Sequence, residues 1–208
     1  MKPITIDYIK SLKKQKTSFA TLTAYDFVSA QILNEAEIPL ILVGDSASMM
    51  VYGYNTTIPV SMEEMLLVVR AVSKASNYSL VVADMPFLSY QPSIKDTVSN
   101  AGRLIKEGSA SAVKLEGGQH MFKNIQELTN IGVPVLGHVG LTPQSYHQMS
   151  GYKIQGKTND EATKIIDDSL AVQEAGAFGV VLECVPESLA TQITQKLSIP
   201  TIGIGSGN

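Results

Sequence analysis

Four acidic residues of this chain stand at the ends of short apolar runs of the kind that form buried β-strands. They are Asp45, Asp84, Glu116 and Glu183. A single acid after a strand is commonly a helix N-cap or a partner in a loop ion pair. Four acids gathered in one cleft would repel one another unless a cation is bound there. Oxygen ligands, with no cysteine and few histidines, indicate a hard cation, and Mg²⁺ is the first expectation.

Two basic residues accompany these acids. Lys114 lies two positions before Glu116 on the same expected strand, so both side chains point to one face. An inward Lys114 would bind a small anionic substrate, whereas an outward one would pair with a helix acid. His138 ends the fifth strand in the sequence GHVGLTP. Its position at a strand end favours a functional role, and the alternative is a hydrogen-bonded structural histidine.

The remaining residues with reactive or ligand-binding groups carry weaker signals. Cys184 follows Glu183, so strand alternation places it on the opposite face, where we expect it to be buried and unreactive. His120 and His147 lie in helix or loop contexts and are expected at the surface. The glycine-rich stretch Gly203–Asn208 has backbone amides that could hold a ligand.

Seven apolar runs, rich in Val, Ile and Leu, are expected to form the strands that position these residues. They cover residues 19–25, 40–44, 80–84, 111–117, 133–140, 179–185 and 200–205. Their nearly continuous hydrophobicity is typical of strands covered on both faces, as in parallel sheets. Helical segments separate the strands, and this alternation indicates an α/β protein. In a barrel, the C-terminal strand ends converge on one rim, where active sites are built.

Start and stop signals mark several of the helices. Capping-box sequences at residues 61–64 and 158–161 predict two helix N-termini, and the second helix should end near Gly176. Another helix should begin after Ser93. Pro186 is expected in the first turn of a helix, where proline is tolerated.

The length and the strand count favour one incomplete barrel. A chain of 208 residues is large enough for one domain and short for two. No Gly-x-Gly-x-x-Gly turn follows the first strand, which weighs against a dinucleotide-binding fold. Seven strands are one fewer than a (β/α)8 TIM barrel contains, and such barrels typically take about 250 residues. We predict a single barrel domain over residues 1–208 that lacks its last βα unit.

Composition excludes several other classes of protein. The net charge is −3 and the basic residues are scattered, so nucleic acid is not expected as a partner. A single cysteine leaves no internal disulfide. No apolar stretch approaches the roughly 18 residues of a membrane span, so no membrane partner is expected. The N-terminal sequence lacks the apolar region of a signal peptide, so the expected location is cytoplasmic.

Eight short motifs, in order along the chain, resemble the ketopantoate hydroxymethyltransferase (3-methyl-2-oxobutanoate hydroxymethyltransferase) family. They are TAYD (23–26), LVGDS (42–46), ADMPF (83–87), VKLEGG (113–118), GHVGLTPQS (137–145), GYKIQGK (151–157), LECVP (182–186) and IGIGSGN (202–208). Each motif alone is weak, but eight in order are specific. The resemblance runs from end to end of this chain, whereas family members continue through a further helix and an eighth strand.

The resemblance implies a (β/α)8 barrel related to the phosphoenolpyruvate mutase and isocitrate lyase group. It implies Mg²⁺ and, as one-carbon donor, 5,10-methylenetetrahydrofolate. The implied reaction moves a hydroxymethyl group to 3-methyl-2-oxobutanoate and gives 2-dehydropantoate (ketopantoate), in pantothenate (vitamin B5) and coenzyme A biosynthesis. It also implies a homo-oligomer, in this family a homodecamer.

The resemblance further implies roles for seven residues. The metal would be bound by three acids: Asp45, Asp84 and Glu116. The 2-oxo acid would lie against the two aspartates and three more residues: Ser46, Lys114 and His138. Glu183 would be the catalytic acid/base.

This chemistry meets a plain physical need. The C3 hydrogen of 3-methyl-2-oxobutanoate is only weakly acidic, and its removal leaves negative charge on the 2-oxo oxygen. A bound Mg²⁺ stabilises that charge as a Lewis acid. A carboxylate made more basic by burial and acidic neighbours can take the proton. We assign this role to Glu183, because Asp45 and Asp84 are committed to the metal.

Two alternative functions are open on the sequence. One is a carbon–carbon lyase acting on a 2-oxo or 2-hydroxy acid through the same metal chemistry, without a folate site. Lyases of that group often use a catalytic cysteine in a flexible loop, whereas Cys184 is expected in a strand. The other is an inert, incomplete barrel that only binds a ligand or partner. The missing eighth unit favours it, and the four intact strand-end acids weigh against it.

Overall fold

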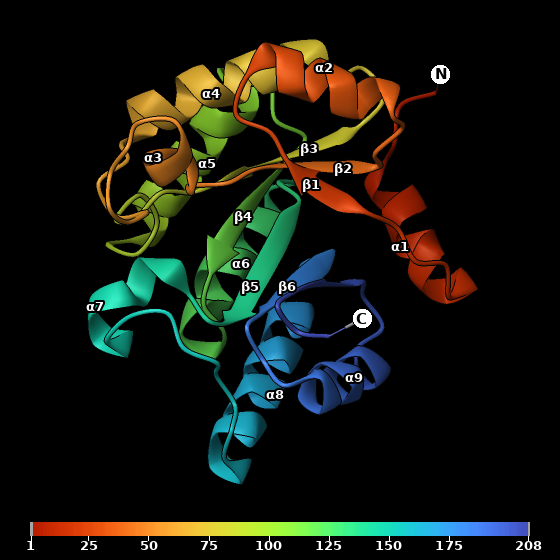
Figure 1. Ribbon diagram of the computed structural model, residues 1–208, viewed down its shortest axis with the longest axis vertical. Coiled ribbons are helices and arrows are strands. Elements are labelled where there is room, and N and C mark those ends of the chain that lie inside the picture. The colour runs from red at the N-terminus through yellow and green to blue at the C-terminus, as the bar shows by residue number, and fades with distance from the viewer. Residues whose placement is uncertain (1, 208) are drawn as a thin grey trace.

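The computed structural model describes residues 2–207, and its centre is one sheet of seven parallel strands. The strands pair in chain order, and the sheet curls into a nearly closed barrel whose two edges are β1 and β7 (Figure 1). The strands are β1 (Thr21–Thr23), β2 (Leu40–Val43), β3 (Leu80–Asp84), β4 (Ala112–Glu116), β5 (Val135–Gly140), β6 (Gly179–Glu183) and β7 (Thr201–Ile204). All seven expected strands are present, although every strand except β3 is shorter than its apolar run, β1 most of all.

Helices connect successive strands and cover the outside of the sheet (Figure 1). The longer ones are α1 (Ile6–Gln15), α2 (Phe27–Glu35), α4 (Met62–Ala75), α5 (Ile94–Lys106), α6 (Phe122–Asn130), α8 (Asn159–Glu174) and α9 (Glu187–Lys196). Short helical turns follow three strands: α3 (Ala47–Met50), η1 (Gln119–Met121), η2 (Pro143–Ser145) and α7 (Tyr146–Met149). No helix among residues 2–207 is long and apolar enough to cross a membrane.

The helix signals of the sequence have direct structural counterparts. Ser61 and Thr158 both form capping boxes, in which the side chain of the residue three positions later bonds back to the cap. Gly176, at φ 97°, follows the end of α8. The expectation for Pro186 is wrong in detail. With ψ at 140°, Pro186 is the N-cap residue, and α9 begins at Glu187.

The inner face of the barrel is apolar at one end and polar at the other. Ile9 and Leu12 of α1 close the apolar end by packing against inward side chains of β2 to β6. On β3, Leu80 and Val82 belong to this inner cluster, and Asp84 is the next residue on the same face. The same period of two continues on β4, β5 and β6. The fold therefore collects the polar residues at the C-terminal rim, above an apolar floor.

Candidate active site

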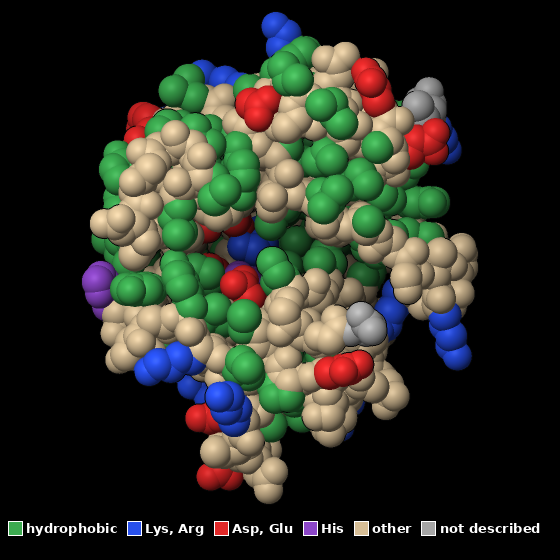
Figure 2. Space-filling model, in the orientation of Figure 1, with side chains coloured by type: hydrophobic (Ala, Val, Ile, Leu, Met, Phe, Trp, Pro, Cys, Tyr) green, Lys and Arg blue, Asp and Glu red, His purple; other side chains and the backbone are tan. Residues whose placement is uncertain are grey.

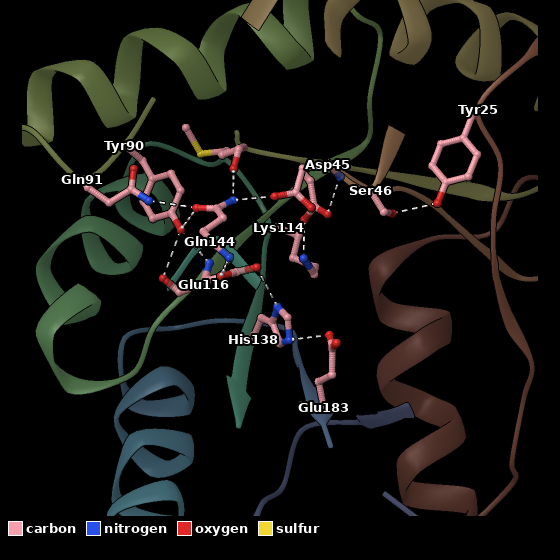
Figure 3. A network of polar contacts seen from close by, with 12 residues as sticks. Tyr25, Asp45, Ser46, Tyr90, Gln91, Lys114, Glu116, His138, Gln144 and Glu183 are labelled. Carbon is pink, nitrogen blue, oxygen red and sulfur yellow. Dashed lines mark hydrogen bonds and ion pairs between the residues drawn. The ribbon is translucent and has the colours of Figure 1, made fainter. Parts of the chain in front are cut away.

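Four of the predicted residues lie on three adjacent strands, and Figure 3 shows three of them, Lys114, Glu116 and His138, pointing into the barrel. Asp84 is paired in register with Lys114 across β3 and β4, and Glu116 is paired with His138 across β4 and β5. All four are buried. Glu183 ends the neighbouring strand β6, so parallel register alone brings these five side chains to one end of the barrel.

Lys114 points inward and forms a buried ion pair. Its Nζ lies 2.5 Å from Oδ1 of Asp84, and the two side chains are 5% and 3% exposed. An outward Lys114, paired with a helix acid, is therefore excluded. Burial alone would lower the pKa of Lys114, but the charges of Asp84, Asp45 and Glu116 raise it above its ordinary value. The barrel interior thus holds a fixed positive charge among carboxylates.

Asp45 lies two residues beyond β2, and its carboxylate is buried beside that of Asp84. The Asp45 backbone N–H donates to Oδ2 of Asp84 at 3.0 Å. Burial, followed by the charge of Asp84, raises the pKa of Asp45 from 3.8 to about 8. Asp45 is not a helix N-cap, because that position of α3 falls on Ser46. A buried carboxylate whose ionisation is disfavoured in this way fits a site that binds a cation.

Ser46 is brought to the rim by the Gly-Asp-Ser turn after β2. Its Oγ lies 2.7 Å from the hydroxyl of Tyr25, which follows β1. A Cβ added at Gly44 would stand 2.6 Å from Oγ of Ser46 and 3.5 Å from Oδ2 of Asp84. A side chain at position 44 would therefore displace the hydroxyl of Ser46. Tyr25 was not assigned a role from the sequence, although it is part of the TAYD motif.

His138 lies between two carboxylates. Its Nε2 is 3.1 Å from Oε2 of Glu183, and its Nδ1 is 3.6 Å from Oε1 of Glu116, although neither contact has the alignment of a hydrogen bond. Burial and Lys114 would lower the pKa of His138, but Glu116 and Glu183 raise it above 6.5. Glu183 is less buried than expected, and its side chain is 20% exposed. The imidazole thus lies between the buried Glu116 and the partly exposed Glu183 at the rim.

Gln144 is the main site residue that sequence reasoning missed. It lies in η2, after β5, and its buried side-chain amide bonds to Asp45 and to Tyr90. Tyr90, in the segment after β3, is also buried and was not predicted. The LTPQS part of the fifth motif was the available signal, since Pro143 indicates a turn directly beyond a strand end.

The weaker candidates are exposed or differ from expectation, and one of them, His120, lines the cavity that adjoins Glu116 and Gln144. Cys184 is half-buried instead of buried, because β6 ends at Glu183 and Cys184 adopts φ 48°, so strand alternation no longer applies. Burial raises the pKa of its thiol. His120 and His147 are exposed, as predicted. The stretch Gly203–Asn208 begins in the last two residues of β7 and continues beyond it. Asn208 lies outside the described residues, and ligand binding by this stretch stays a prediction.

The donor set fits a Mg²⁺ site with two protein ligands. Asp45 and Asp84 are neighbouring, buried oxygen donors, and Mg²⁺ is usually held by one or two carboxylates together with water and substrate oxygens. Within residues 2–207, no three His, Cys, Asp or Glu side chains converge closely enough to enclose a metal ion. Glu116 instead accepts a hydrogen bond from the Gln144 backbone at 3.0 Å. Its role as a third ligand stays a prediction.

The cluster is open to solvent at the rim. Figure 2 shows basic and acidic side chains at the bottom of a hollow in the face of the molecule, surrounded by apolar ones. A cavity of about 120 Å³ adjoins it and is lined by residues that include Tyr90, Glu116 and Gln144. A small anion could therefore reach the lysine and the carboxylates from outside.

Relatives of this chain share one activity name. The family described as ketopantoate hydroxymethyltransferase matches residues 3–208. The 3-methyl-2-oxobutanoate hydroxymethyltransferase of Carboxydothermus hydrogenoformans is 52% identical, over 100% of this chain and 75% of that protein. The protein of the same name from Syntrophus aciditrophicus is 50% identical, over 98% of this chain and 75% of that protein.

Solved structures with a similar fold have much lower identity. A 2,3-dimethylmalate lyase of the PEP mutase/isocitrate lyase superfamily has a TM-score of 0.68 at 17% identity, covering 97% of this chain and 72% of its own. A phosphoenolpyruvate phosphomutase from Streptomyces platensis subsp. rosaceus has a TM-score of 0.70 at 14% identity, covering 95% and 72%. These likenesses confirm the predicted barrel fold. Because the sequence match extends over almost the whole chain at about half identity, the chain belongs to the ketopantoate hydroxymethyltransferase family.

Proposed function

We propose that this chain transfers a hydroxymethyl group from 5,10-methylenetetrahydrofolate to 3-methyl-2-oxobutanoate. With one water consumed, the products are tetrahydrofolate and 2-dehydropantoate. The observation that carries this proposal is the buried group of Asp45, Asp84 and Lys114 at the barrel rim, in a chain whose relatives at 50% and 52% identity bear that activity name.

The metal assigned to the site is Mg²⁺. Asp45 and Asp84 would hold it, and Glu116 would complete the metal site, supported by Gln144 and His138. Bound there, Mg²⁺ would act as a Lewis acid and stabilise the charge that develops on the 2-oxo oxygen. The carboxylates then no longer repel one another. Burial and the charge of Asp84 raise the pKa of Asp45 and so disfavour its ionised form. A bound cation would favour the ionised form, which supports the metal assignment.

Three residues are assigned to the 2-oxo acid. Lys114 supplies a fixed positive charge for the substrate carboxylate, in a pocket where water competes little. Ser46 follows Asp45 directly, and its hydroxyl is oriented by that of Tyr25. His138 offers a ring N–H to the same space, with its orientation limited by the two carboxylates on either side. Together they distinguish a 2-oxo acid from an uncharged carbonyl compound.

Glu183 is assigned as the base that takes the C3 proton. It is the acid of the cluster that is not held by Lys114 or Gln144, and its contact is with His138 at 3.1 Å. Its partial exposure supports this assignment, because the folate-borne carbon would arrive from the open rim. His138 lies beside this carboxylate and would attract it when the imidazole is protonated. After the carbon–carbon bond forms, the proton can leave Glu183 to solvent through the open rim.

The wider setting is also part of the proposal. We place the reaction in cytoplasmic pantothenate and coenzyme A biosynthesis. We further expect a homo-oligomer, with a homodecamer as the first candidate. Exposed apolar side chains on neighbouring helices support a subunit contact, such as Val28 and Ile32 on α2 and Leu67 on α4. Native mass spectrometry of the chain measures the assembly directly.

The direct test measures 2-dehydropantoate formation by the purified chain with Mg²⁺, 5,10-methylenetetrahydrofolate and 3-methyl-2-oxobutanoate. Asp45→Asn should abolish turnover, and Asp167→Asn, the same change at an exposed position of α8, should not. A wild-type chain that binds Mg²⁺ but forms no product would favour the inert barrel. Cleavage of a 2-oxo or 2-hydroxy acid without folate would favour the lyase.

A further inference from the structure

Gln144 sits at the centre of the polar network shown in Figure 3. It is the middle residue of the turn η2 (Pro143–Ser145), directly beyond the loop that ends β5. Pro143 fixes the start of that turn. The Gln144 side chain is only 5% exposed, so its amide is committed to protein partners.

The side-chain amide of Gln144 uses its whole hydrogen-bonding capacity. Its Nε2 donates to Oδ2 of Asp45 and to the carbonyl of Met85, both at 2.9 Å. Its Oε1 accepts from the hydroxyl of Tyr90 and from Nε2 of Gln91, both at 2.8 Å. The backbone carbonyl of Met85 only accepts, so the amide nitrogen must face it. The network therefore permits one orientation of this amide.

The backbone of Gln144 holds a second carboxylate. Its N–H donates to Oε2 of Glu116 at 3.0 Å. This N–H belongs to the first turn of a 3₁₀ helix and has no partner within that turn. Asp45 follows β2 and Glu116 ends β4, so one residue of the β5 loop joins acids from two strands that are not adjacent.

We propose that Gln144 is a positioning residue, which fixes the carboxylates of Asp45 and Glu116 in the directions needed to bind the metal and the 2-oxo acid. The inference rests on the proposed function, because that function assigns the metal to Asp45. Within residues 2–207, Asp45 accepts side-chain hydrogen bonds only at Oδ2, from Gln144. The amide thus holds one oxygen and leaves Oδ1 for another partner. Without this hydrogen bond, the Asp45 carboxylate would have to be oriented when the metal binds.

The first test compares Gln144→Met with Gln126→Met. Methionine has a similar length but no amide, and Gln126 is an exposed residue of α6 that serves as the matched control. Calorimetry gives the Mg²⁺ dissociation constant without any turnover, and circular dichroism checks the fold. Loss of a group that orients a metal ligand typically costs roughly 10–100-fold in affinity. We expect that loss in Gln144→Met and none in Gln126→Met.

A second variant keeps the shape of the side chain. Gln144→Glu retains the oxygen that accepts from Tyr90 and Gln91 and the backbone N–H to Glu116, but it replaces the donor to Asp45 with a second oxygen. An added negative charge would by itself attract Mg²⁺ more strongly. The positioning role instead predicts that kcat falls roughly 10–100-fold even at saturating Mg²⁺. A side chain that merely fills space would leave kcat unchanged in this variant.

The outcomes separate this inference from the proposed function. A wild-type Mg²⁺ affinity in folded Gln144→Met, or a wild-type kcat in Gln144→Glu, would overturn the positioning role. If the wild-type chain binds Mg²⁺ but forms no 2-dehydropantoate, the proposed function fails, and the Mg²⁺ affinity of Gln144→Met still decides the role of Gln144. A wild-type chain that binds no Mg²⁺ overturns both.

Discussion

Lys114 and Asp84 form an ion pair inside the barrel, with 2.5 Å between Nζ and Oδ1 and both side chains almost fully buried. Their strands place them opposite each other in register. A buried lysine needs such partners, and here the neighbouring carboxylates raise its pKa despite burial. The pair therefore keeps a positive charge available beside the carboxylates assigned to the metal.

Replacing Lys114 should weaken binding of the 2-oxo acid without weakening binding of Mg²⁺. Lys114→Met removes a charge-assisted hydrogen bond, worth about 1.5–3 kcal/mol, or roughly 10–100-fold in the dissociation constant. It also removes a cation that repels the metal. Calorimetry measures both affinities, and Lys164→Met on the exposed surface of α8 is the control. An unchanged affinity for 3-methyl-2-oxobutanoate would exclude Lys114 from the substrate site.

Mg²⁺ should stabilise the folded protein through Asp45. A ligand that binds only the folded state raises the melting temperature by linkage, and here it also relieves repulsion between buried carboxylates. Asp45→Asn should abolish the Mg²⁺-dependent rise, whereas Asp167→Asn should keep it. Thermal unfolding with and without Mg²⁺ provides the measurement. A full Mg²⁺-dependent rise in Asp45→Asn would show that the metal binds elsewhere.

Glu116 and Asp45 should contribute unequally to Mg²⁺ binding. Glu116 is already engaged by the Gln144 backbone and lies beside His138, so Glu116→Gln should weaken Mg²⁺ binding less than Asp45→Asn does. Titration of the two variants under one set of conditions compares them. Equal losses would place Glu116 among the direct ligands, on the same footing as Asp45.

The metal-free protein should lose stability as the pH rises. The pKa of Asp45 is about 8 in the folded protein and near 3.8 without the fold, so the folded state binds this proton more tightly. Its stabilising contribution is complete below the lower value and is lost as the pH rises through about 8. The raised pKa of His138 acts in the same direction.

Melting temperatures in EDTA across this pH range test the expectation. Asp45→Asn should flatten the profile, because asparagine does not titrate. Mg²⁺ competes with the proton on Asp45, so the rise in melting temperature that Mg²⁺ causes should grow as the pH increases. A metal-free profile that climbs towards pH 8 would contradict the burial of an ionisable Asp45.

Much of the site could be predicted because strand periodicity determines it. Leu80, Val82 and Asp84 share one face of β3, so an apolar run that ends in an acid defines both the floor and the rim of the barrel. The same reasoning placed Lys114 and Glu116 on one face of β4, and the structure confirms it. These positions need only the local pattern and the parallel order of the strands.

Other positions depend on loop paths that the local pattern does not specify. Gln144 reaches Asp45 across 99 residues of sequence, and its amide has no chemistry that would single it out in a motif. Tyr90 belongs to the segment after β3, and its hydroxyl bonds to Gln144 and Glu116. Cys184 escaped prediction for a different reason, since one residue with φ 48° ends the alternation of β6.

The central claim is that Glu183 takes the C3 proton of 3-methyl-2-oxobutanoate. Glu183→Gln keeps the shape of the side chain but cannot accept that proton. Positioned acid/base groups typically contribute roughly 10²–10⁴-fold, so the loss should appear in turnover while the affinities for Mg²⁺ and substrate stay nearly intact. Glu174→Gln, at the exposed end of α8, is the matched control.

Hydrogen–deuterium exchange at C3, followed by NMR with Mg²⁺ and without folate, is the measurement that tests this claim most directly. It isolates proton removal from formation of the carbon–carbon bond. We predict exchange by the wild-type chain and by Glu174→Gln, and a loss of roughly 10²–10⁴-fold in Glu183→Gln. Exchange at a nearly wild-type rate in Glu183→Gln would contradict the assignment and point to His138, 3.1 Å away, as the base.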